Sequence, residues 1–243
     1  MDKIFMRFPG GMAKAFSISL EADDSLRVVK LFKLYKLLGS LKINISLKNA
    51  SKSLEEYQSY GASLGLAIND SKALALLDNI QNKQLCKKFM HFSYSYFNIN
   101  TIMRKELREA GIKYMAIDRE SFSFTPSSDS YKITPTCNIK NKELMIMSHR
   151  FTAELDNSDA LLFYVSGRVE NDSDIGKIDE LLSYLDSRDQ IYYSSISKIY
   201  DYLNDFKRLI RTKGFIKNPT ARSLYFSYRN KSFEIKPNEI IAL

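Results

Sequence analysis

Short stretches in which apolar and polar residues alternate are separated along the chain by stretches with a helical period. Alternation with a period of two predicts half-buried strands, whereas apolar residues three and four apart predict amphipathic helices. These patterns predict strands at 17–22, 41–47, 65–69, 89–96, 114–117, 161–166 and 190–193. They predict helices at 26–38, 53–60, 100–110, 142–155, 174–185 and 195–212.

Repeated strand–helix units of this kind indicate an α/β fold, either a parallel (β/α) barrel or an open parallel sheet. The continuous apolar run at 161–166 is typical of a parallel strand that is buried on both faces. Residues 223–228 and 232–235 flank a short polar turn and predict a β-hairpin. The sequence therefore predicts a main α/β domain, 1–216, followed by a small C-terminal β-hairpin unit, 217–243.

Two adjacent carboxylates, Asp23 and Asp24, come directly after the first predicted strand. The carboxyl ends of parallel strands form the face on which α/β proteins build their sites. Two neighbouring acids do not ionise together easily unless a cation or strong hydrogen-bond donors neutralise them. The alternative is purely structural, because Asp24 or Ser25 would also be a good N-cap for the helix that follows.

Composition and charge argue against several classes of protein. The 243 residues are 44% hydrophobic and carry a net charge of +8, but the 36 basic residues are spread along the chain, which argues against a nucleic-acid-binding protein. The N-terminus has no apolar core or cleavage site, and no apolar run approaches the roughly 20 residues of a membrane span. Cys86 and Cys137 lie far apart, which predicts two free thiols and a cytoplasmic protein.

The stretch Leu162–Arg168 resembles a late strand of the polysaccharide deacetylase (NodB homology) family. The likeness continues through Asp179–Leu182, Ile191–Tyr193, Lys198–Tyr202 and Lys217–Ala221 to the predicted hairpin. Earlier in the chain, Phe92–Tyr96 resembles a Phe-Ala-Tyr-Pro-Tyr strand of one bacterial branch of the family. Ser17–Asp24 then falls on the strand that carries the Asp-Asp motif of the family.

This resemblance implies a distorted (β/α) barrel of about seven strands and metal-assisted removal of acetyl groups from a sugar. In the family, one Asp is the general base, the second Asp and a His-x-x-x-His pair hold a divalent metal, and a later His is the general acid. The metal polarises the acetyl carbonyl and activates water, and the acid protonates the leaving group.

Most of these functional positions are altered in this chain. Asp23 falls on the base position and Asp24 on the metal-ligand position, but Asp70 and Leu74 stand where the two histidines belong. Arg168 stands where the general acid belongs, and a guanidinium does not release its proton near neutral pH. Tyr94 and Tyr96 are carried over as cleft residues.

Arg168 suggests what replaces the lost groups. We predict that its guanidinium pairs with Asp23 or Asp24, because a forked donor suits a carboxylate. The alternative is an ordinary surface arginine. The chain has only two histidines, His91 and His149, and isolated histidines in such patterns are usually structural.

Three functions follow as expectations. The first is a degenerate, metal-free deacetylase-like protein that binds a sugar, a polysaccharide precursor or a protein partner. The second is an active hydrolase that removes N- or O-acetyl groups with Asp23 and Asp24 and an atypical metal such as zinc, for instance with Asp70 and His91. The third is an interaction scaffold with Tyr94, Tyr96, Phe122 and Phe124 at an interface.

Overall fold

A computed structural model describes residues 3–22, 25–35, 40–44, 63–68, 91–94, 105, 108–109, 113–117, 119–129, 132–156, 159–186 and 188–243. The helices in it are α1 (Ser25–Leu34), α6 (Leu144–Ala153), α7 (Asp172–Leu185) and α8 (Ile196–Lys207), with a 3-10 turn at Pro9–Gly11. From the N-terminus to residue 193, the strands are β1 (Ile4–Arg7), β2 (Lys14–Ala22), β3 (Ser40–Asn44), β4 (Ser63–Ile68), β5 (His91–Tyr94), β6 (Tyr114–Ile117), β7 (Cys137–Asn138), β8 (Leu161–Val169) and β9 (Ile191–Tyr193). The C-terminal strands are β10 (Ile210–Arg211), β11 (Phe215–Lys217), β12 (Leu224–Tyr228), β13 (Lys231–Ile235) and β14 (Ile240–Ala242).

An eight-stranded sheet with the order β6-β5-β4-β3-β2-β8-β7 organises the molecule, and β9 also pairs with β2. Every strand pair in this sheet is parallel. The predicted α/β class and the parallel sheet are therefore confirmed. The closure of the sheet into a seven-stranded barrel stays a prediction.

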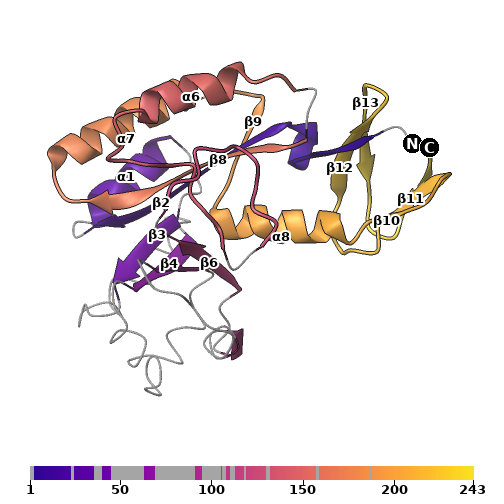
Figure 1. Ribbon diagram of the computed structural model, residues 1–243, viewed down its shortest axis with the longest axis horizontal. Helices are drawn as coiled ribbons and strands as arrows, with labels where there is room; N and C mark the ends of the chain where they lie inside the picture. Colours follow the sequence, from indigo (N-terminus) through magenta and orange to yellow (C-terminus); the bar gives the residue numbers. More distant parts are fainter. Residues whose placement is uncertain are drawn as a thin grey trace.

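Each face of the central strand β2 is buried against a different layer. Phe16, Ile18 and Leu20 point to the face covered by α1, α6 and α7, where they join one hydrophobic cluster. Ala15, on the opposite face, belongs to a second cluster that contains the apolar side of α8. Figure 1 shows α1, α6 and α7 on one side of β2 and β8, and α8 on the other. We call the face of β2 and β8 on the α8 side the inner face.

The segment 132–138 contacts strands near both ends of this strand order. Ile133 forms a parallel bridge with Ala116 of β6, with hydrogen bonds of 2.9 and 3.0 Å to the backbone of Ile117 and Met115. A few residues later, the Thr136 N–H donates to the Tyr164 carbonyl of β8 at 2.7 Å. The segment therefore contacts β6 at its start and β8 at its end.

Two small antiparallel sheets lie at one end of the molecule, beside both termini (Figure 1). The predicted hairpin is present as β12 and β13, and the N-terminal strand β1 pairs with β12 to make a three-stranded sheet. A second sheet has the order β10-β11-β14. The proposed boundary at 216/217 falls inside β11, and the division into two domains stays a prediction.

The structure differs from the predicted elements in two places. The long helix predicted over 195–212 ends at Lys207, because Ile210 and Arg211 pair with β11 instead of continuing α8. Residues 4–7 carried no predicted element, yet they form β1. In both cases strand pairing determines the local structure, with the neighbouring β11 in the first case and with β12 from the opposite end of the chain in the second.

Buried tyrosines should make the fold sensitive to alkaline pH. Burial raises the pKa of the Tyr193 phenol to about 12, and burial also raises the pKa values of Tyr114, Tyr200 and Tyr202 well above their usual range. In the unfolded chain these phenols ionise at about pH 10. Their contribution to stability is therefore complete below that pH and is lost as the pH rises toward the folded-state values.

We expect the free energy of unfolding to fall between pH 10 and pH 12, by up to about 1.4 kcal/mol per pH unit for each phenol. Urea denaturation at pH 8 and pH 11 measures the loss. Tyr200→Phe removes one buried phenol and should make the loss smaller. Equal stability of the native chain at both pH values would contradict this expectation.

Candidate functional site

Two of the predicted site residues lie in the described part of the chain, at the carboxyl ends of parallel strands. Arg168 is the last residue but one of β8, and Tyr94 is the last residue of β5. Asp23 and Asp24 follow the end of β2 directly in sequence, but they lie outside the described residues. Asp70 and Tyr96 lie two residues after the ends of β4 and β5, and they are outside the described residues as well.

The Arg168 side chain reaches an acid that the sequence did not single out. Its Nη1 atom lies 3.9 Å from Oε1 of Glu21, and the two residues are in register on β8 and β2. The Arg168 side chain is 42% exposed and that of Glu21 is 13% exposed. A pair this open to solvent contributes at most about 1 kcal/mol to stability. The Arg168 guanidinium can also donate hydrogen bonds to a ligand, and the Glu21 carboxylate can accept them. The predicted contact of Arg168 with Asp23 or Asp24 involves residues outside the described part and stays a prediction.

On the inner face, the residues of β2 and β8 that precede this pair carry hydroxyl groups. Ser19 is in register with Ser166, and Ser17 is in register with Tyr164. Residues in register across parallel strands share a face, and side chains on one strand alternate, so these rows lie on the same face as Glu21 and Arg168. The inner face is thus polar from Ser17 to the carboxyl edge.

Three of the buried hydroxyls have no hydrogen-bond partner among the described residues: Ser17, Ser19 and Ser194, which lies just after β9. Their residues are 1%, 0% and 3% exposed. The Ser194 N–H donates to the Phe16 carbonyl at 3.2 Å, which places Ser194 beside Ser17. Buried polar groups are normally satisfied by protein, water or ligand. This row therefore marks a place where water or a ligand hydroxyl group would be bound.

A close backbone approach holds β7 against β8 next to Arg168. A Cβ atom at Gly167 would lie 2.5 Å from Cγ1 of Ile139 and 3.0 Å from Oδ1 of Asn138. Glu120 fixes the loop on the other side, because its carboxylate accepts from the Asn138 N–H at 2.6 Å and from the Asn141 amide at 2.9 and 3.0 Å. Only glycine at 167 lets these elements come together.

The described residues do not include a complete set of ligands for the metal that the family resemblance implies, and Asp23, Asp24 and Asp70 lie outside them. A catalytic metal site needs about three protein ligands, and among the described residues there is no group of three His, Cys, Asp or Glu side chains that could hold an ion. His91 is the first residue of β5 and so lies at the amino end of the sheet, away from the carboxyl edge. His149 is on α6, with its ring centroid 4.2 Å from that of Tyr184. The site with Asp24, Asp70 and His91 stays a prediction, because Asp24 and Asp70 lie outside the described residues.

Two further predictions concerned aromatic residues and charge. Phe124 is buried against Phe151 and Phe163, so it is a core residue and not part of an interface. Phe122 is 47% exposed.

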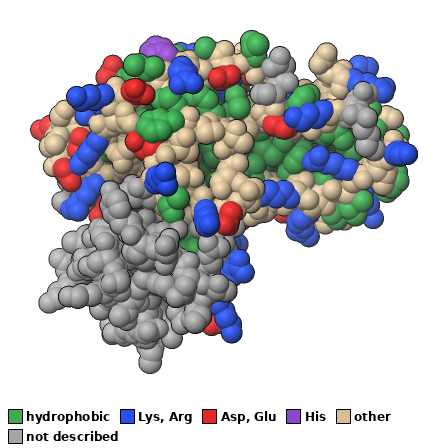
Figure 2. Space-filling view, viewed as in Figure 1, with side chains coloured by type: hydrophobic (Ala, Val, Ile, Leu, Met, Phe, Trp, Pro, Cys, Tyr) green, Lys and Arg blue, Asp and Glu red, His purple; other side chains and the backbone are tan. Residues whose placement is uncertain are grey.

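Figure 2 shows Lys and Arg side chains dispersed over the visible face. Within the described part of the chain no helix is long and apolar enough to cross a membrane.

The sequence contained a signal for the residues that were missed. Ser17, Ser19 and Glu21 alternate with Ile18 and Leu20, so they share one face of a strand that otherwise looks fully buried. The pairing of Glu21 with Arg168 could not be predicted, because it depends on which strand lies next to β2 and in what register.

No protein-family model and no curated protein sequence matches this chain. Solved structures do. Peptidoglycan deacetylase PdaC from Bacillus subtilis matches in two forms, both with a TM-score of 0.51. A point variant is 11% identical and the match covers 82% of this chain and 95% of that one; the other form is 10% identical, with 80% and 94% covered. The uncharacterized protein ATU2773 from Agrobacterium tumefaciens is 8% identical, with a TM-score of 0.45, and the match covers 82% of this chain and 100% of that one. At this identity the match to PdaC shows a shared fold, so the predicted fold resemblance is confirmed in that respect.

Proposed function

We propose that this protein is a deacetylase-like carbohydrate-binding protein of surface polysaccharide metabolism that works without the catalytic metal. The observation that carries the proposal is the polar inner face of the parallel sheet, which ends in Glu21 and Arg168. We infer further that the sheet closes into a distorted barrel of seven strands. The contacts of segment 132–138 with β6 and β8 support this closure.

The chemistry of the edge suits a sugar. A guanidinium only donates hydrogen bonds and a carboxylate only accepts them, whereas hydroxyl groups do both. Arg168 can therefore donate to a ring hydroxyl or to the carbonyl of an N-acetyl group, while Glu21 accepts from a neighbouring hydroxyl. Arg168 remains protonated near neutral pH, so it binds and orients the ligand and does not transfer a proton.

Cofactor and location belong to the same proposal. We expect no bound metal, because Asp70 and Leu74 stand where the family has its two histidine ligands, and His91 begins β5 at the amino end of the sheet. We also place the protein in the cytoplasm. Cys137 supports this assignment as a free and buried thiol, and burial raises its pKa to about 12.

A tryptophan reporter tests the proposed binding site. The chain contains no tryptophan, so a single introduced one reports only its own surroundings. Glu170, two residues after Arg168, is exposed, and the fluorescence of a Glu170→Trp variant should change saturably when N-acetylchitotetraose is added. Adding Arg168→Ala should weaken this binding at least tenfold, which is the loss of about one charge-assisted hydrogen bond.

Arg150→Ala is the matched control, because Arg150 is an exposed arginine on α6, away from the carboxyl edge. It should leave the titration unchanged. Equal binding with and without the Arg168 side chain would show that the edge is not the binding site.

A further inference from the structure

A cleft of about 620 Å³ lies at the other end of β2 from the candidate site. One wall is the β1-β12-β13 sheet, and the opposite wall is formed around Leu155, Asp189 and Gln190. Its volume is within the range of small-molecule sites, and clefts between structural units are common binding places.

The wall from the antiparallel sheet presents a row of residues of mixed character. Phe5 is in register with Ser227, and Ser227 is in register with Ser232, so all three share one face. The Arg7 guanidinium carbon lies 5.8 Å from the centroid of the Phe5 ring, which holds the ring in place. This face therefore combines an aromatic surface with two hydroxyl groups.

The base of the cleft is the turn at Gly10 and Gly11. Both have positive φ values, +78° and +79°, and a Cβ atom at Gly11 would meet no atom within 4 Å. The turn thus leaves open space beside the sheet face, where a ligand could contact the backbone closely.

The cations near the cleft are already bonded to protein oxygen atoms. The Arg7 guanidinium donates to the carbonyls of Met6 and Asp156 at 2.8 and 2.6 Å. The Lys14 ammonium donates to the Thr152 carbonyl at 3.0 Å and lies 3.4 Å from the Asp156 carboxylate. Since their charge is used within the protein, the cleft is not built for an anion. Aromatic, hydroxyl, amide and carboxylate groups together suit a neutral ligand rich in hydroxyl groups.

We infer that this cleft is a second carbohydrate-binding site, which takes a short neutral oligosaccharide segment. Ala13, at the cleft, and Glu21, at the carboxyl edge, are eight residues apart on an extended strand, or about 26 Å. The inference rests on the proposed function for the class of ligand. It adds a site at the amino end of the sheet that would bind a polysaccharide independently of Arg168.

A reporter in the cleft tests this site on its own. Gln190 is exposed and lines the cleft, and the fluorescence of a Gln190→Trp variant should change saturably with N-acetylchitotetraose. Ser232→Arg in the same background should fill the cleft and weaken binding at least tenfold. Lys231→Arg is the control, because Lys231 is exposed on the same strand and its side chain points to the opposite face.

Arg168→Ala should leave the Gln190→Trp titration unchanged, since Arg168 lies at the far end of β8. An absent response at Gln190→Trp, or one that survives Ser232→Arg unchanged, overturns the second site. If Glu170→Trp still responds in that case, the proposed function stands and only this inference fails. A response at Gln190→Trp without one at Glu170→Trp would support the cleft and contradict the proposed binding at the carboxyl edge. A response to inorganic pyrophosphate stronger than that to the oligosaccharide would also overturn the inference, because it would mean that the cleft prefers anions.

Discussion

Replacing Asn218 with alanine is expected to lower the free energy of unfolding by about 3–4 kcal/mol, because several buried groups lose their partners together. The Asn218 amide donates to the carbonyls of Arg222, Ile235 and Lys236 at 2.8, 3.0 and 3.1 Å. Its Oδ1 atom accepts from the N–H and the hydroxyl of Thr220 at 3.0 and 2.7 Å. Asn218 is 0% exposed, so water cannot easily replace these bonds.

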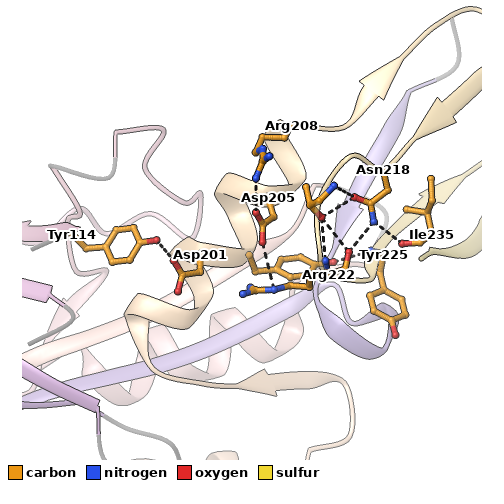
Figure 3. Close-up of polar contacts among 10 residues, drawn as sticks. Tyr114, Asp201, Asp205, Arg208, Asn218, Arg222, Tyr225 and Ile235 are labelled. Carbon is orange, nitrogen blue, oxygen red and sulfur yellow. Dashed lines mark hydrogen bonds and ion pairs between the residues drawn. The ribbon is translucent and has the colours of Figure 1, made fainter. Parts of the chain in front are cut away.

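This side chain joins the two small sheets. Asn218 follows β11, which belongs to one sheet, and Ile235 ends β13, which belongs to the other. Figure 3 shows Asn218 between Arg222 and Ile235, next to the end of α8 that carries Asp205. Asp205 in turn lies 3.5 Å from the Arg222 side chain, which connects the network to α8.

Urea denaturation of the two forms measures the loss. Lys236→Ala is the matched control, because only the carbonyl of Lys236 takes part and its side chain is exposed. The control should differ from the native chain by less than about 0.5 kcal/mol. A loss of less than about 1 kcal/mol for Asn218→Ala, within the range of a single ordinary hydrogen bond, would show that the network does not hold the sheets together.

Gly167→Ala is expected to lower the free energy of unfolding by about 2–3 kcal/mol, the usual cost of overpacking a core. The added methyl group would lie 2.5 Å from Cγ1 of Ile139, which is 0% exposed and cannot move aside freely. The strand β8 must shift away from β7, and this shift displaces Arg168 as well. Binding reported by Glu170→Trp should therefore weaken along with stability.

Gly176→Ala should have the opposite effect on the free energy of unfolding. Gly176 is inside α7, and a Cβ atom there would meet no atom within 4 Å. Alanine favours a helix over glycine by about 1 kcal/mol, so this variant should be more stable than the native chain. If both glycine variants were equally stable, the close contact between β7 and β8 would be wrong.

The fold was largely predictable where the signal is local. The helix predicted from residue 174 is α7, which begins at Asp172, where the Asn171 side chain accepts from the Asp174 N–H at 3.0 Å. Ser195 is the N-cap of α8, as its place at the start of the predicted helix suggests. Apolar residues at helical spacing, such as Ile196, Ile199 and Leu203, are the ones that α8 buries.

Long-range pairing was not predictable in the same way. Residues 4–7 form a strand only because β12 lies beside them, and β12 comes from the opposite end of the sequence. For the same reason the carboxyl edge could be predicted but the contact of Arg168 with Glu21 could not. Local patterns identify which residues share a face, whereas packing of the whole chain decides which faces meet.

We propose that this deacetylase-like fold binds no metal, and elemental analysis of the purified, chelator-free protein tests this proposal most directly. Inductively coupled plasma mass spectrometry on the native chain and on Asp24→Ala should find zinc, nickel, cobalt and manganese far below one ion per chain in both. Acetate release from an N-acetylated oligosaccharide should be absent in both as well. Nearly one ion per chain in the native protein, removed by Asp24→Ala together with acetate release, would contradict the account and establish an active hydrolase instead.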